Sequence, residues 1–127
     1  PSNMDAKVLL YVAMGGALGA VLRYLIGNWL STEQMPWGTL TVNLVGSLLL
    51  GSLMGAAASS EAVSKEMVLF LGVGVLGAFT TLSTFSIDTI NLWKDGQIST
   101  ALLYAISTSV LGPLLALLGW IAAEQAI

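Results

Sequence analysis

The sequence predicts an all-α membrane protein with four transmembrane helices, the third of them broken at mid-membrane. Three observations lead to this fold class: an apolar composition, four apolar stretches of spanning length, and a polar interruption in the third stretch. Hydrophobic residues make up 56% of the 127 residues and charged residues only 9%, whereas soluble domains carry about a quarter charged residues. The net charge of −3 is scattered, so no binding of nucleic acid is expected.

Each stretch offers the roughly 20 mostly apolar residues that a membrane-crossing helix needs. The four spans are expected at about residues 7–29, 38–59, 67–93 and 98–123. Tryptophans fall near the expected span ends, as interfacial aromatic belts do; they are Trp29, Trp37, Trp93 and Trp120. One four-helix transmembrane domain is therefore expected over residues 4–127, and residues 1–3, which precede Met4, are interpreted as a remnant of cloning.

Two glycine pairs place small residues on one face of the first and second spans. They are Gly15 with Gly19, and Gly51 with Gly55. Small residues at this spacing let helices approach closely in lipid. Two interpretations follow, namely packing within one bundle or packing across an interface between subunits.

The third span contains the most informative segment of the chain. Three glycines loosen the helix and four hydroxyl residues follow; these are Gly72, Gly74, Gly77, Thr80, Thr81, Ser83 and Thr84. Backbone that breaks at membrane depth is tolerated only where it is buried in protein or lines a wet cavity. Broken helices recur at ion sites, where free carbonyls face cations and helix N-termini face anions. The segment therefore predicts ion handling.

The four basic residues give no preferred orientation in the membrane. With four spans, Lys7 and Lys65 share one side, and Arg23 and Lys94 share the other. Because an excess of Lys and Arg in cytoplasmic loops sets orientation, a two-against-two tally leaves either another orienting signal or insertion both ways up. Four helices do not readily enclose a pore, so we expect an antiparallel, dual-topology homodimer.

Two polar residues in the first half of the chain have structural and functional interpretations. Arg23 either extends to the headgroups from near its span end or forms an electropositive vestibule that attracts an anion. Asn43 either makes a hydrogen bond between helices or supplies an amide donor to an aqueous path. Ser47 lies one helical turn further on the same face.

The fourth span carries a short stripe of hydroxyl groups. Tyr104, Ser107 and Thr108 share one helix face by their spacing, although such residues often only bond back to their own helix. With Ser83, Thr84 and Asn43 they could form a file of neutral donors, which suits a small, strongly hydrated anion.

Two further residues of the third span have competing interpretations. Asp88 is the one acidic residue well inside a span, where it could serve as a proton or cation site, or play a structural or vestibule role. Phe85 is either packing or a ring whose electropositive edge faces an anion.

Three motifs in order make the chain resemble the Fluc-type fluoride channels of bacteria, the CrcB family. They are the runs at residues 15–23, GGALGAVLR, at 37–46, WGTLTVNLVG, and at 77–86, GAFTTLSTFS. The resemblance implies passive export of cytoplasmic fluoride through two antiparallel pathways in a dual-topology homodimer of the bacterial inner membrane. It also implies a structural, central sodium ion held by the carbonyls of Gly77 and Thr80. The fluoride pathway it implies comprises Arg23, Asn43, Ser83, Thr84, Phe85, Tyr104 and Thr108.

The chain departs from the family pattern at three positions. Leu82 stands where the family usually has the first of two Phe residues, so half of the usual pair of phenyl rings is missing. Ala78 replaces a common second glycine, and Asp88 a common Glu. We expect fluoride conduction with an altered rate or ion occupancy.

Three alternative functions compete with this interpretation. A small four-helix, dual-topology, proton-coupled multidrug exporter matches the size and the charge balance, but it needs a carboxylate in the first span, which has none after Asp5. A purely structural membrane subunit leaves the polar break unexplained. An enzyme is not expected, because no nucleophile–base pair can be assembled without His or Cys.

Overall fold

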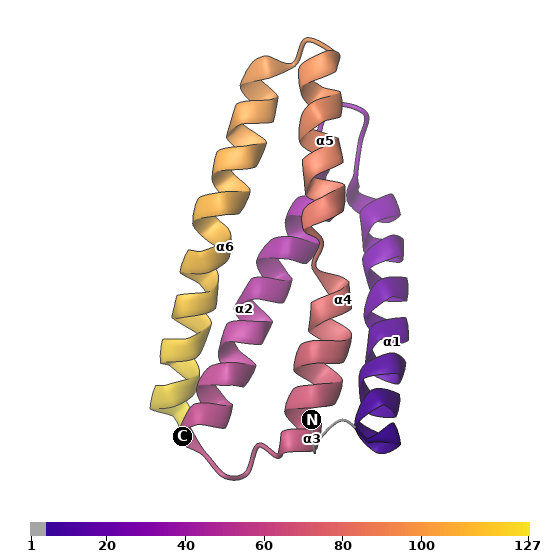
Figure 1. Cartoon of the computed structure of the whole chain (residues 1–127). Helices are drawn as coiled ribbons and strands as arrows, with labels where there is room; N and C mark the ends of the chain where they lie inside the picture. Colours follow the sequence, from indigo (N-terminus) through magenta and orange to yellow (C-terminus); the bar gives the residue numbers. More distant parts are fainter. Residues whose placement is uncertain (1–4) are drawn as a thin grey trace.

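A computed structural model describes residues 5–127, so the interpretation of residues 1–3 lies outside the described residues. The described chain is helical and passes up and down four times (Figure 1). The first pass is α1 (Ala6–Leu30), the second is α2 (Trp37–Ser59) and the fourth is α6 (Ile98–Ala126). The third pass consists of four short elements and is described below. The C-terminus lies at the same end of the molecule as the start of α1 (Figure 1).

All four passes are long and apolar enough to cross a membrane, with the third counted as Lys65–Lys94. The predicted spans are therefore confirmed as helices. Their ends agree closely; the largest difference is at the end of α6, expected at residue 123 and found at Ala126. Hydropathy locates such helices well because a helix is the simplest way to satisfy every backbone group in lipid.

The third pass is interrupted, as the glycines and hydroxyls predicted. It comprises α3 (Lys65–Met67), the π-helix η1 (Val68–Leu76), α4 (Gly77–Phe79) and α5 (Leu82–Lys94). The glycines do not form the break itself: Gly72 and Gly74 lie in the π-helical segment, where i→i+5 hydrogen bonding widens the helix. The chain instead turns extended at Thr80 (ψ 155°) and Thr81 (ψ 116°). Figure 1 shows this break near mid-height of the molecule.

Glycines set how closely the helices pack within the chain. A Cβ added at Gly15 or Gly19 would collide with the backbone of the third pass, and one added at Gly51 or Gly55 with the backbone of α6. The two predicted glycine pairs therefore serve packing within the bundle, which was the first of the two interpretations. These contacts join α1 to η1 and α2 to α6, the two most extensive helix pairs.

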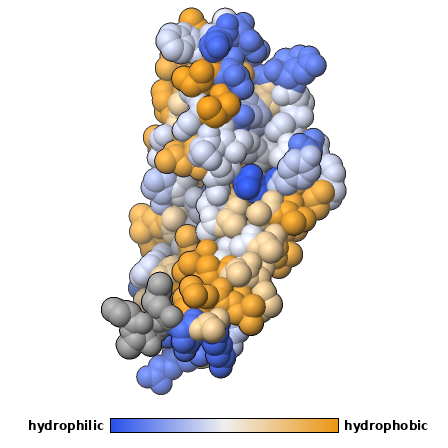
Figure 2. Space-filling view, turned by 45° about the vertical axis from the view of Figure 1, so that its right-hand side comes forward, coloured by the Kyte–Doolittle hydropathy of each residue, from blue (hydrophilic) through white to orange (hydrophobic). Residues whose placement is uncertain are grey.

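Two small cores lie on either side of the break. On the side of η1 and α4, Val42, Leu76 and Phe79 are buried together. On the side of α5, Leu92, Ala101 and Tyr104 form the second core. Many large apolar side chains remain exposed, for example Leu103 at 66%. Figure 2 shows apolar residues over much of this face, most densely in its lower part, and hydrophilic residues at both ends and near mid-height. This distribution suits a molecule whose apolar sides contact lipid or another subunit.

Candidate functional site

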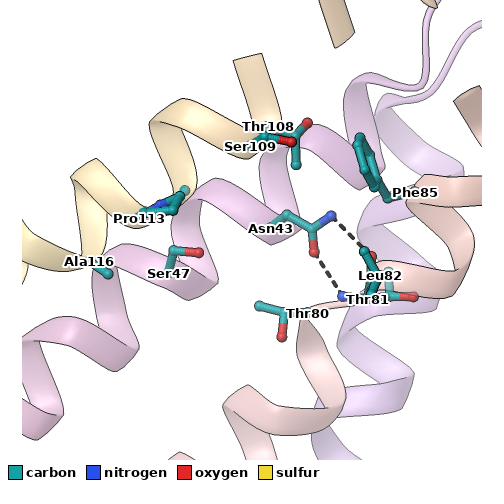
Figure 3. A pocket seen from close by; sticks show the side chains of 11 residues that line it. Asn43, Ser47, Thr80, Thr81, Leu82, Phe85, Thr108, Ser109, Pro113 and Ala116 are labelled. Atoms are coloured by element: carbon teal, nitrogen blue, oxygen red, sulfur yellow. Dashed lines mark hydrogen bonds between the residues drawn. The ribbon is translucent and has the colours of Figure 1, made fainter. Parts of the chain in front are cut away.

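Asn43 on α2 bridges the broken backbone of the third pass. The Thr81 N–H donates to Asn43 Oδ1 at 2.8 Å, and Asn43 Nδ2 donates to the Thr81 carbonyl at 3.2 Å. Figure 3 shows the two bonds side by side. Asn43 is only 9% exposed, so its amide replaces partners that the backbone loses where the helix stops. One Nδ2 hydrogen is left over for a further acceptor.

Arg23 on α1 caps the lower half of the broken helix. Its Nε donates to the Ala78 carbonyl at 3.1 Å. A guanidinium is favourable there, because the C-terminal end of a helix carries partial negative charge. Arg23 is half-buried beside the break.

The break also leaves the carbonyls of Gly77 and Thr80 without their helical partners. In a continuous helix, the Thr81 N–H would bond Gly77 and the Thr84 N–H would bond Thr80. Here the Thr81 N–H donates to Asn43, and the Thr84 N–H donates to the Thr81 hydroxyl at 3.1 Å as a helix N-cap. Within residues 5–127, the Gly77 and Thr80 carbonyl oxygens are thereby left without their helical hydrogen bonds and could act as neutral ligands. Hard cations such as sodium prefer oxygen ligands of this kind, so the residues present fit the expected ion.

A large cavity, of about 540 Å³, lies between the break, α2 and α6. Asn43, Phe85 and Thr108 line it, as Figure 3 shows. The Thr108 hydroxyl oxygen is buried and, within residues 5–127, has no hydrogen-bond partner. A buried hydroxyl without a partner costs on the order of 1–3 kcal/mol. Thr108 is therefore suited to donate to an ion or water in this cavity.

Phe85, Tyr104 and Asp88 form a contact chain above the large cavity. The rings of Phe85 and Tyr104 have centroids 5.1 Å apart at an interplanar angle of 53°. The Tyr104 hydroxyl donates to Asp88 Oδ2 at 3.1 Å. Tyr104 is completely buried, so its hydroxyl holds Asp88 and its ring supports Phe85. The ring of Phe85 still faces the cavity.

A second cavity, of about 330 Å³, lies on the other side of Thr81. Arg23, Thr84 and Asp88 line it together. Thr81 belongs to the walls of both cavities. A basic and an acidic side chain therefore face one polar chamber, next to the larger cavity and separated from it by the broken backbone.

The structure brings most of the sequence-predicted residues together and leaves two apart. Ser83 is exposed, and its hydroxyl lies 3.3 Å from that of Thr81. Ser107 lines neither cavity, whereas its neighbour Ser109 lines the larger one. Sequence reasoning also missed Thr81 as the residue joining both cavities, although a Thr at the start of a helix is a recognisable N-cap signal.

Leu82, the departure from the family pattern, projects into the open large cavity. Its side chain is 76% exposed and is among the residues that line the cavity. Leu82 is the first residue of α5, so it lies directly beside the break. Phe79 does not take its place, because the Phe79 ring is 6% exposed and packs below the break.

Together the fold and these cavities define a small four-helix membrane protein built around a broken third helix. A family model described as CrcB-like protein, Camphor Resistance (CrcB), matches residues 10–120. The chain therefore belongs to the CrcB family.

Several curated proteins resemble the chain over most of its length, and those named here are all called fluoride-specific ion channel FluC. The protein of Thermus thermophilus is 46% identical over 92% of this chain and 94% of its own length. That of Agrobacterium fabrum is 47% identical over 78% of this chain and 82% of its own length. That of Helicobacter acinonychis is 38% identical over 93% of this chain and 96% of its own length.

Proposed function

We propose that this chain is a fluoride-selective ion channel that lets cytoplasmic fluoride leave the cell passively. The observation that carries the proposal is the large cavity, where the unpartnered Thr108 hydroxyl and the remaining Asn43 N–H lie on neighbouring helices. The relatives' shared name, fluoride-specific ion channel, gives the identity of the ion.

Neutral donors are the chemistry that a small anion requires here. Fluoride is strongly hydrated, and it enters a protein only where hydrogen-bond donors replace its water. Asn43, Thr108 and the electropositive edge of Phe85 offer such contacts. None of them carries a full positive charge, so the ion is not trapped. Arg23 adds a positive charge to the adjoining chamber, which it shares with Asp88.

Export needs no energy source beyond the membrane gradient. In acidic surroundings fluoride enters the cell as neutral HF. The HF dissociates in the cytoplasm, and the fluoride ion is retained there. The negative interior then drives the anion outward, at about 2.3 kcal/mol per charge for each 100 mV. The multidrug exporter remains disfavoured, because α1 (Ala6–Leu30) has no carboxylate.

The finer part of the proposal is an assembly of two inverted copies in a bacterial inner membrane. Each copy would contribute to two antiparallel fluoride pathways, with Ser83, Thr84 and Tyr104 as further pathway residues. The free carbonyls of Gly77 and Thr80 from both copies would hold one structural sodium ion, which ties the two breaks together. Supporting this, the large cavity is open on one side and bordered by the 76% exposed Leu82.

Fluoride efflux from potassium-loaded liposomes containing the purified protein tests the proposal. Valinomycin clamps the counter-charge, a fluoride electrode reads the release, and chloride-loaded liposomes serve as the control. Fast fluoride release without chloride release is expected. If the wild-type protein releases no fluoride, repeating the assay with Leu82→Phe separates a pathway disabled by Leu82 from a wrong assignment of function.

A further inference from the structure

We infer that Ser47 is a further fluoride-contacting residue, which extends the donor file of the large cavity beyond Asn43 and Thr108. The inference rests on the proposed function. Ser47 lies four residues after Asn43 on α2, and Gly112 lies four residues after Thr108 on α6. Four residues rise about 6 Å along a helix. The two facing helices therefore present two successive levels to the same cavity, and Ser47 belongs to the second.

Gly112 leaves room for an ion beside the Ser47 hydroxyl. A Cβ added at Gly112 would lie 3.6 Å from Ser47 Oγ, which is its nearest neighbour outside the local helix. Because glycine has no side chain, no methyl group fills the space beside the hydroxyl, where an added Cβ would make van der Waals contact with it. Figure 3 shows Ser47 on α2, the helix that also carries Asn43, and Ala116 on the neighbouring α6.

The Ser47 hydroxyl is free to donate into that space. Serine and threonine in helices commonly donate to the carbonyl four residues earlier, and Ser52 on the same helix does so, to Leu48 at 2.8 Å. In the described part of the chain, no hydrogen bond involves the hydroxyl of Ser47. A hydroxyl without an existing partner can donate a hydrogen bond to an anion without breaking another one.

Ser47 also lies where the polar lining ends. It borders a further open cavity of about 440 Å³, which is distinct from the Arg23 chamber and whose other walls are mainly apolar, formed by Leu50, Gly51, Met54, Ala116, Leu117 and Trp120. An anion that moves along the large cavity away from the break therefore meets Ser47 as the last hydroxyl before an apolar surface. Loss of that donor should slow passage of the ion past this level.

The test compares fluoride efflux of three variants with that of the wild-type protein in the liposome assay. Ser47→Ala is expected to lower flux about tenfold, equivalent to about 1.4 kcal/mol. Ser47→Thr, which keeps the hydroxyl, should retain most of the flux. Ser52→Ala is the matched control, because it removes a hydroxyl from the same helix that is bonded to Leu48, and its flux should equal that of wild type.

A second variant approaches the same position from the facing helix. Gly112→Ala places a methyl group in the proposed ion position and should also reduce flux, while Ser47 itself is unchanged. Wild-type flux in both Ser47→Ala and Gly112→Ala would overturn the inference but leave the channel assignment intact. Absence of fluoride flux in the wild-type protein would instead overturn the proposed function, on which the inference depends.

Discussion

At the residue scale, three side chains give the break its shape and the cavity its chemistry. Asn43 makes two hydrogen bonds to the Thr81 backbone, Arg23 caps a helix end, and the buried Thr108 hydroxyl has no partner within residues 5–127. Each is a polar group in an apolar molecule, where an unmet hydrogen bond is costly. Their cost is offset only where the broken backbone or a passing ion supplies the partner.

Leu82 is the residue whose replacement should change conduction most directly. Leu82→Phe would project a phenyl ring into the cavity from an exposed position, and its positive edge would stabilise an anion. We expect fluoride flux to rise a few-fold, corresponding to on the order of 1 kcal/mol. The liposome assay measures this, with Leu82→Met as a control of similar size without a ring. Equal flux for wild type and Leu82→Phe would contradict the expectation.

Asn43→Leu should weaken the fold as well as the pathway. The substitution keeps a similar branched shape but removes both hydrogen bonds to the Thr81 backbone. The Thr81 carbonyl still accepts the first bond of α5 as an N-cap residue does, whereas the Thr81 N–H loses its partner at a cost of about 1–3 kcal/mol. The apparent Tm in detergent should fall and fluoride flux should be lost. Asn91→Leu, at an exposed position of α5, is the control and should leave Tm almost unchanged; an equal Tm for both variants would argue against the bridge.

At the scale of elements, the spans and the existence of the break could be predicted, because the bilayer fixes helix length and forbids unsatisfied backbone. The point of the break could not. It depends on Asn43 and Arg23, which lie 38 and 55 residues from the backbone that they bond. From local propensity, the helix was expected to loosen at the glycines. Contacts between distant helices instead place the extended backbone at Thr80 and Thr81. Ser83 and Ser107 line neither of the two cavities beside the break in the single chain, since helix spacing alone does not define which face meets a cavity; their place on the pathway stays a prediction.

Glycine packing gives a prediction at this scale with a matched control. Gly19→Ala would drive a methyl group into the Val75 carbonyl of η1, and overpacking of this kind costs about 1–3 kcal/mol or more. The purified variant should show a lower apparent Tm and a broad size-exclusion profile. Gly16 lies on the same helix with nothing within 4 Å of an added Cβ, so Gly16→Ala should behave as wild type. A Gly19→Ala protein as stable as Gly16→Ala would contradict the predicted close contact.

At the scale of the whole molecule, the proposed assembly of two copies would account for three features of the single chain. The chain has a large open cavity, much exposed apolar surface and two free carbonyls at one break. The basic residues are nearly balanced between the two ends, with Lys7 and Lys65 toward one end and Lys94 toward the other. Arg23 lies beside the break, so it orients the chain less than a loop residue would.

Removal of sodium should separate the proposed dimer. If the carbonyls of Gly77 and Thr80 from both copies hold one sodium ion, exchange into N-methyl-D-glucamine should abolish fluoride flux and shift the protein toward a monomer on size exclusion. Sodium should restore both. Thr80→Ala is the control, because the Thr80 hydroxyl already donates to the Leu76 carbonyl at 3.2 Å and only the main chain would bind the ion. Flux that is independent of sodium would contradict the ion's structural role.

Dual topology predicts that each end of the molecule faces each side of the membrane in about equal proportion. The chain has no native cysteine, so single substitutions report position cleanly. Ala62→Cys lies in the connection between α2 and α3, and Gln97→Cys lies in the turn before α6, at the opposite end (Figure 1). An impermeant maleimide added to intact spheroplasts should label about half of each variant. Complete labelling of one and none of the other would mean a single orientation.

The charge balance itself can then be changed to test whether the inverted partner is required. Asp95→Lys combined with Gln97→Lys adds two basic residues to the turn between α5 and α6, and these should hold that end in the cytoplasm. External labelling of Ala62→Cys in this background should rise toward completion. Fluoride flux should fall with it, because copies that all point one way cannot form an antiparallel pair. Co-expression with a variant biased the opposite way, such as Glu61→Lys with Lys94→Gln, should restore flux, whereas persistent flux from the biased chain alone would show that inversion is not needed.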